Sequence, residues 1–217
     1  MIGVLDLQGG VQEHLVHLQR LGVAAQPVKE PEEFARLAGL IIPGGESTCL
    51  RRLLDTFELK AVIQHHHENG MKVWGTCAGA ILLASENLGE TPYFGFIDVT
   101  VKRNAFGSQL ESFHGEAHIP RVAPEPVPLT FIRAPQITRV GADVEVLLQL
   151  EGYIAAAENA EVLVTVFHPE LTPSLAFHRY FAHKCGLTTT ADEVDHPLDP
   201  TWTRHRWMQC PRKIKLP

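Results

Sequence analysis

Short apolar runs alternate with amphipathic segments along the first half of the chain. The run at 2–7 leads into a segment, 11–22, whose apolar residues recur every three or four positions, as on one face of a helix. Gly22 then ends the periodicity, and glycine is typical of helix C-termini. Continued along the chain, the alternation predicts strands at 2–7, 24–29, 39–45 and 72–76, and helices at 11–21, from Pro31, at 47–69 and at 78–88.

The second half has a different pattern, in which strand-like segments follow one another directly. Proline, glycine and asparagine separate these segments, which favours added antiparallel strands. We expect them at 94–104, 128–135, 144–150 and 152–159, then a buried strand in 161–170 and a closing helix at 173–185. The whole pattern predicts an α/β fold with three layers: a mostly parallel central sheet covered on both faces, plus the antiparallel strands. This domain spans 1–187, and 188–217 is expected to be an irregular C-terminal tail.

Composition and charge narrow the class of protein. The 217 residues are 45% hydrophobic, which suffices for one packed domain. A formal net charge of −6 argues against a nucleic-acid partner, and the apolar runs are far shorter than the roughly 20 residues of a membrane span. The first residues enter a strand without the features of a signal peptide, so we expect a cytoplasmic protein whose four cysteines are free thiols.

Unusual residues follow four of the expected strands. These strand ends read LQGG, PGGES, GTCAG and FHPE. Because the carboxyl ends of parallel strands meet at one edge of a sheet, and sites form at that edge, we expect the four segments to build a single site.

Cys77 lies where the strand at 72–76 meets the next helix. The sequence Gly75-Thr76-Cys77-Ala78-Gly79 has the form of a nucleophile elbow, with cysteine in place of the usual serine. The N-terminus of the following helix would favour the thiolate, and the Ala78 N–H is placed to stabilise an oxyanion. A buried structural cysteine in a tight turn is the alternative.

A cysteine nucleophile needs a base and a group that orients the base. His168 and Glu170 are two residues apart in FHPE, so on extended backbone their side chains point to the same side. Pro169 between them disfavours a helix. Taken alone, this pair fits the polar end of any strand, but together with the elbow it predicts a Cys77–His168–Glu170 triad. In PGGES, the backbone N–H groups of Gly44 and Gly45 can converge on a developing negative charge, while Ser47 can cap the helix.

Other clusters of polar residues are weaker evidence for a functional site. The consecutive residues His65, His66 and His67 fan out around a helix and cannot converge on one ion. His14 and His17 share a helix face, where core or surface positions are the simpler interpretation. Cys49 is expected to be a small buried residue of its helix. We therefore expect neither a metal nor an organic cofactor.

Taken together, these segments resemble the class I, or triad-type, glutamine amidotransferases, which share a flavodoxin-like fold. Within that class they are similar to the family of glutaminase subunits of pyridoxal 5′-phosphate synthases. The similarity rests on six segments in order, over about residues 1–187: GVLDLQGGVQEH, LIIPGGESTCLRRLL, GTCAGAILLA, VKRNAFGSQLESF, FIRAPQI and VFHPELT. One departure follows HPELT, where Pro173, Ser174 and Leu175 replace a region that usually carries an acidic residue and an arginine.

The resemblance implies a role for each matching residue. Cys77 would attack the side-chain amide of L-glutamine and form a glutamyl thioester, with His168 as general base and acid and Glu170 orienting it. An arginine can grip the α-carboxylate of the substrate with two hydrogen bonds. The implied substrate-binding residues are Gly45, Glu46, Ser47, Arg103, Ile132 and Arg133, and those implied for the oxyanion hole and its gating are Gln8, Gly9, Gly44 and Ala78.

The resemblance also implies a partner. The ammonia would pass to a (β/α)₈-barrel synthase subunit that makes pyridoxal 5′-phosphate in vitamin B6 biosynthesis, within a large hetero-oligomer. In this family the glutaminase works poorly without that partner. The alternatives are a glutaminase of another amidotransferase pathway, a cysteine peptidase or esterase on the same fold, and a non-catalytic docking or regulatory subunit.

Overall fold

A parallel sheet forms the centre of the computed structural model, which describes residues 1–103 and 112–190. Its strands lie in the order β2-β1-β3-β4-β12, and every neighbouring pair is parallel. The strands are β1 (Ile2–Leu5), β2 (Ala25–Val28), β3 (Gly39–Ile42), β4 (Lys72–Thr76) and β12 (Val162–Thr165). Four of them (β1, β3, β4 and β12) precede the unusual segments, so the expected common edge is confirmed.

The sheet continues beyond β12 with mainly antiparallel strands. β11 pairs with β12, β10 and β9, and β9 pairs with β6, all antiparallel, while β5 pairs with β6 in parallel. A separate antiparallel hairpin joins β7 and β8. The strands are β5 (Ala84–Asn87), β6 (Ile97–Lys102), β7 (Ser112–Ala117), β8 (Val127–Ile132), β9 (Gln136–Val140), β10 (Glu145–Leu150) and β11 (Tyr153–Glu158). The predicted antiparallel additions are thus confirmed, although β7 and β9 were not expected.

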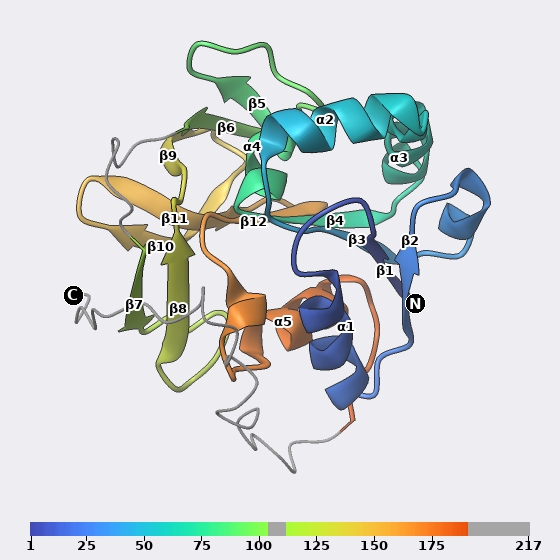
Figure 1. Cartoon of the computed structure of the whole chain (residues 1–217). Helices are drawn as coiled ribbons and strands as arrows, with labels where there is room; N and C mark the ends of the chain where they lie inside the picture. The colour runs from blue at the N-terminus through green and yellow to red at the C-terminus, as the bar shows by residue number, and fades with distance from the viewer. Residues whose placement is uncertain (104–111, 191–217) are drawn as a thin grey trace.

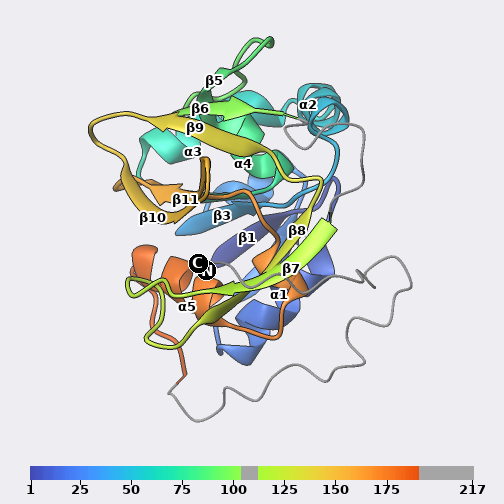
Figure 2. The same ribbon diagram turned by 90° about the vertical axis from the view of Figure 1, so that its left-hand side faces the viewer.

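Helices cover both faces of the sheet and complete three layers (Figures 1 and 2). On one face lie α1 (Val11–Arg20) and α5 (Ala176–Lys184); on the other lie α2 (Ser47–Thr56), α3 (Leu59–Glu68) and α4 (Ala78–Leu83). Short 3₁₀ helices, η1 (Pro31–Phe34) and η2 (Pro169–Leu171), complete the elements. The strands β1, β3 and β12 are fully buried, as strands covered on both faces must be.

Two predicted helices are wrong in extent. The expected helix at 47–69 is two helices, α2 and α3, because Glu58 between them adopts a left-handed backbone with φ of 55°. The expected helix at 78–88 ends at Leu83, and the next residues form β5 by pairing with β6. Cys49, expected to be buried, is exposed on α2.

The ends of elements also differ from the sequence prediction. The expected strand at 2–7 stops at Leu5, and the helix expected from Pro31 is the single 3₁₀ turn η1. The closing helix α5 begins at Ala176, where the Ser174 Oγ accepts a hydrogen bond from the Ala176 N–H at 3.2 Å. Leu175, part of the departure from the family pattern, is buried in the core.

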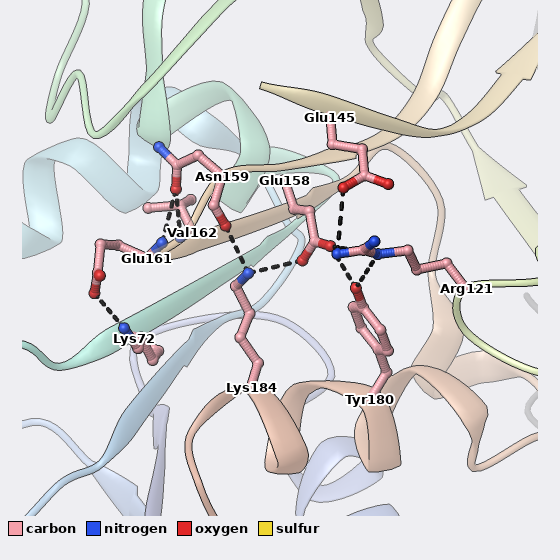
Figure 3. A network of polar contacts seen from close by, with 9 residues as sticks. All are labelled: Lys72, Arg121, Glu145, Glu158, Asn159, Glu161, Val162, Tyr180 and Lys184. Atoms are coloured by element: carbon pink, nitrogen blue, oxygen red, sulfur yellow. Dashed lines mark hydrogen bonds and ion pairs between the residues drawn. The ribbon is translucent and has the colours of Figure 1, made fainter. Parts of the chain in front are cut away.

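A network of charged groups joins α5 to the sheet (Figure 3). Glu158 of β11 is 3% exposed, and its carboxylate accepts hydrogen bonds from Lys184 Nζ at 2.7 Å and from the Tyr180 hydroxyl. The Arg121 guanidinium lies 3.6 Å from the same carboxylate and 3.3 Å from that of Glu145. α5 is therefore held at its C-terminal half by a carboxylate with permanently charged partners.

The described chain ends beside α1. The Thr190 N–H donates to the Leu21 carbonyl at 2.9 Å, and residues 188–190 form neither helix nor strand. The rest of the expected tail, and the NAFGSQLE part of the fourth family segment, lie outside the described residues. Within the described residues, no helix combines the length and apolar character needed to cross a membrane.

Candidate active site

Cys77 occupies a strained turn between β4 and α4. Its backbone has φ of 49° and ψ of −102°, a conformation that residues other than glycine rarely adopt. The flanking glycines make the turn possible, because a Cβ at Gly75 would lie 2.5 Å from the Gly79 carbonyl carbon. A Cβ at Gly79 would in turn collide with the Ile42 carbonyl of β3. The predicted elbow geometry is present, and Cys77 is 7% exposed at its tip.

His168 and Glu170 follow β12 at the same edge of the sheet. The His168 Nδ1 lies 2.8 Å from the Glu170 Oε1, so this ring nitrogen carries the proton that the carboxylate accepts. The His168 N–H donates to the Thr130 carbonyl of β8 at 2.8 Å, and Pro169 opens the 3₁₀ turn that carries Glu170. Because His168 Nδ1 is bonded to Glu170, Nε2 is the ring nitrogen available to Cys77.

The charges of these groups depend on one another. Burial disfavours the His168 imidazolium, but the Glu170 carboxylate and the Cys77 thiolate outweigh it and raise the His168 pKa well above its usual value. Burial also disfavours the carboxylate of Glu170, yet the histidines His14 and His168 lower its pKa to about 2. The arrangement therefore favours a carboxylate on Glu170 beside an imidazolium on His168.

Gly44 after β3 lies directly against the histidine and the cysteine. A Cβ at this position would be 2.5 Å from His168 Cε1 and 3.4 Å from Cys77 Cβ. Gly9 has a φ of 93° and packs on the Gly44 carbonyl, where a Cβ would collide. The Gln8 side chain packs on Gly45, where a Cβ would lie 2.9 Å away. The structure thus joins the LQGG and PGGES loops beside the elbow.

Three of the expected substrate-binding residues lie at the start of α2. Glu46 caps this helix, a role expected of Ser47: its carboxylate accepts from the N–H groups of Thr48 at 3.1 Å and Cys49 at 2.7 Å. Its own N–H donates to Gln8 Oε1 at 3.2 Å. Ser47 is 3% exposed, and its Oγ has no hydrogen-bond partner among the described residues. Gly45 precedes them with a φ of 135°.

Arg103 and the 132–133 segment approach the site from the antiparallel strands. The Arg103 guanidinium contacts Glu46 Oε1 at 3.1 Å and also the Glu90 carboxylate. Glu90 was not anticipated from the sequence, which gives no spacing signal for it. The Ile132 carbonyl lies 4.0 Å from Cys77 Sγ, and Arg133 after it has a φ of 46° and an exposed side chain. A bound anion near Arg103 would therefore compete with two carboxylates.

A buried histidine cluster behind Glu170 was also missed. His14, His17 and His178 are all fully buried, so of the core and surface positions considered for His14 and His17 the core position is correct. No sequence spacing connects α1 with α5, so the cluster could not be predicted. Among residues 1–103 and 112–190, no group of histidine, cysteine or carboxylate side chains is arranged to hold a metal ion.

A strained cysteine and a His–Glu pair at the carboxyl edge of a parallel sheet define the architecture of the class I glutamine amidotransferases. The model of the SNO glutamine amidotransferase family matches residues 4–187. The chain belongs to this family.

Relatives and solved structures agree with this assignment. The chain is 60% identical over 208 residues to the pyridoxal 5′-phosphate synthase subunit PdxT of Syntrophus aciditrophicus, covering 96% of this chain and 93% of the relative. It is 50% identical to the PdxT of Clostridium botulinum, covering 84% and 96%. A crystal structure of a glutamine amidotransferase superposes with a TM-score of 0.80 at 40% identity, covering 86% of this chain and 99% of that one. The Syntrophus alignment extends past residue 187, into the region that the sequence assigned to the tail.

Proposed function

We propose that this protein is the glutaminase subunit of a pyridoxal 5′-phosphate synthase, and that Cys77, His168 and Glu170 are its catalytic triad. The observation that carries the proposal is the strained Cys77 backbone beside a buried His168–Glu170 pair with a 2.8 Å hydrogen bond. Membership of the amidotransferase family and the PdxT names of its relatives support the reaction and the pathway.

The reaction follows from the proton positions. His168 Nε2 takes the proton of the Cys77 thiol, and the sulfur attacks the side-chain amide carbon of glutamine. Backbone N–H groups at Ala78 and in the Gly9–Gly44 loops stabilise the oxyanion. His168 gives its proton to the departing ammonia, which leaves a glutamyl thioester. Water then attacks the thioester with His168 as base, releasing glutamate and restoring the thiol.

The substrate site lies between α2 and the antiparallel strands. Gly45, Glu46 and Ser47 hold one side of glutamine, while Ile132 and Arg133 hold the other. Arg103 binds the α-carboxylate, and for this its guanidinium must give up part of its contact with Glu46 or Glu90. This exchange couples substrate binding to the position of the 45–47 segment.

Ammonia passes to a (β/α)₈-barrel synthase subunit in a hetero-oligomer in the cytoplasm. Docking of that subunit on the loops of Gln8 and Gly9 completes the oxyanion hole, because these loops already contact Gly44 and Gly45. A hole completed only in the complex prevents wasteful hydrolysis of glutamine.

The direct test is glutamate release from glutamine, by the full chain alone and with the synthase subunit of the same organism. We expect release to rise on adding the synthase and to vanish in Cys77→Ala. No release from a chain that demonstrably binds the synthase would identify a non-catalytic docking subunit. Activation by a different synthase would assign the chain to another amidotransferase pathway.

A further inference from the structure

A line of buried polar contacts continues behind the proposed triad. The Glu170 carboxylate uses Oε1 for His168, and its Oε2 lies 3.6 Å from His14 Nε2 on α1. The other nitrogen of His14, Nδ1, lies 2.8 Å from His178 Nε2 on α5. Glu170 is 1% exposed and both histidines are fully buried, so water does not screen these contacts.

His14 Nε2 and Glu170 Oε2 face each other, and neither is engaged elsewhere in the part of the chain that the structure describes. Within residues 1–103 and 112–190, neither His14 Nε2 nor Glu170 Oε2 has a hydrogen-bond partner. Buried polar atoms are almost always satisfied, because leaving them without a partner is unfavourable. Hydrogen bonds of catalytic groups are often long before substrate binds. The 3.6 Å separation is therefore that of a pair able to close into a hydrogen bond.

The geometry selects one tautomer of His14. If His14 carried its proton on Nδ1, the bare Nε2 lone pair would face the Glu170 carboxylate, which is repulsive. If the proton is on Nε2, that N–H points at Glu170 Oε2, and Nδ1 accepts from the His178 Nε2–H. Burial lowers the His14 pKa to about 4 even though the Glu170 charge opposes it, so His14 is neutral at neutral pH.

The surroundings hold both rings in place. The Trp74 ring of β4 meets the edge of His14 with centroids 5.6 Å apart and that of His178 at 5.0 Å. His17 stacks on His178 with centroids 4.4 Å apart, and its Nε2 lies 3.0 Å from the Thr172 carbonyl. The titratable groups that surround His14 are Glu170, His168, His17 and His178.

We propose that His14 is a positioning residue for the triad: its Nε2–H holds the second oxygen of Glu170, and His178 fixes the tautomer that makes this possible. Through Glu170, the pair keeps the His168 Nδ1–H in place and Nε2 available to Cys77. This inference rests on the proposed function, because it assigns His14 a role in the chemistry of the same site.

The test compares one substitution of His14 that removes the N–H donor with another that keeps a donor near the same place. His14→Leu removes the donor, whereas His14→Gln keeps an amide N–H near the position of Nε2. Leu18→Ala, a fully buried change on the same helix, is the control for lost packing. The readout is the pH dependence of Cys77 alkylation by iodoacetamide in the full chain, with the Cys77 peptide separated from those of the other cysteines. Glutaminase kcat and KM with the synthase are measured in parallel.

The expected result follows from the loss of one buried contact to Glu170. In His14→Leu the second oxygen of Glu170 is no longer held, so the contact of the carboxylate with the His168 Nδ1–H weakens. The His168 imidazolium is then less favoured, and the alkylation profile moves to higher pH. We expect kcat to fall about tenfold at unchanged KM, with His14→Gln within about threefold of the parent. Leu18→Ala should keep the parent profile. A parent-like profile and kcat in His14→Leu, or the same shift in Leu18→Ala, would overturn the role of His14.

Tautomer spectroscopy provides a readout that does not depend on a variant's activity. Long-range ¹H–¹⁵N spectra of the intact protein, with His14 assigned by its substitution, should show Nε2 protonated and Nδ1 bare. The opposite tautomer would overturn the proposal. A parent whose Cys77 reacts like an ordinary thiol and that releases no glutamate with bound synthase would instead overturn the proposed function, and this inference with it.

Discussion

Two buried glutamates, Glu158 and Glu170, are held by different kinds of partner. Glu158 accepts from Lys184 and from the neutral Tyr180 hydroxyl, with Arg121 close by, so two of these three partners carry permanent charges (Figure 3). Glu170 is equally buried, but it faces the imidazoles of His168 and His14, which can each gain or lose a proton. A carboxylate fixed by lysine and arginine holds a helix in place, whereas one held by imidazoles can respond to a proton. The difference separates a structural ion pair from the one that we propose to be reactive.

The largest expected effect is that of Glu170→Gln on activity. The neutral amide keeps the shape of the side chain but no longer favours the imidazolium form or the required tautomer of His168. We expect kcat with the synthase to fall about a thousandfold, measured as glutamate release. Cys77 alkylation near neutral pH should slow in parallel. Retention of more than a tenth of the parent kcat would remove Glu170 from the triad.

Glu158→Gln should lower the stability of the fold and leave the activity nearly unchanged. It leaves Lys184, which is 13% exposed, without its carboxylate partner. Breaking such a buried pair costs about 3 kcal/mol of unfolding free energy, measurable by urea unfolding. The kcat of the folded variant should stay within about twofold of the parent, because Glu158 contacts no proposed catalytic residue. A large loss of kcat at unchanged stability would contradict a purely structural role.

The histidines behind Glu170 predict a specific pH dependence of stability. Burial lowers the pKa of His14, His17 and His178, for His14 to about 4. Between the unfolded value near 6.5 and about 4, the unfolded chain therefore binds more protons than the folded one. The free energy of unfolding should fall as pH falls through that window, by up to about 1.4 kcal/mol per pH unit for each histidine.

Single substitutions test which side chains cause the loss of stability between pH 6.5 and about 4. His14→Gln should reduce the slope by about one proton, whereas Leu18→Ala, which removes no titratable group, should leave it unchanged. The lowered pKa of Glu170, about 2, contributes stability that is lost only as pH falls from about 4.5 toward 2. The raised pKa of His168 has the opposite sign, since its contribution is lost as pH rises through the folded value. A His14→Gln slope equal to that of the parent would exclude a buried neutral His14.

The smallest expected effect is that of Gly10→Ala. Gly10 has a φ of −78°, which alanine tolerates, but a new Cβ would lie 3.1 Å from Glu170 Cγ and 3.3 Å from its Oε1. We expect this displacement of the carboxylate to lower kcat about threefold, with a change in unfolding free energy below about 1 kcal/mol. An unchanged kcat would show that the carboxylate position tolerates a shift of a few tenths of an ångström.

Features set by neighbouring residues could be predicted from the sequence. The elbow glycines around Cys77 and the two-residue spacing of His168 and Glu170 act locally, and both geometries are found in the structure. The parallel direction of the central strands, though not their order, followed from their alternation with helices. For the same reason, the edge at which the site forms was predictable.

Features set by distant partners could not be predicted. β5 forms because β6 pairs with it, and the break at Glu58 depends on a left-handed backbone that glutamate rarely adopts. His14 and His178 are 164 residues apart, so only the packing of α1 beside α5 brings them together. Arg103 likewise contacts Glu90 because the fold brings the two side chains together, and no sequence spacing indicates this pair.

The central claim is that Cys77 carries the substrate as a thioester, and trapping that intermediate tests it most directly. Glutamine is added to the full chain with its synthase subunit, the reaction is stopped with acid within the first turnover, and the Cys77 peptide is weighed by mass spectrometry. The account predicts a glutamyl group on Cys77 in the parent, and its absence when Cys77→Ser or Cys77→Ala replaces the thiol. Rapid glutamate release without any modified Cys77 peptide, or release that persists in Cys77→Ala, would contradict the account.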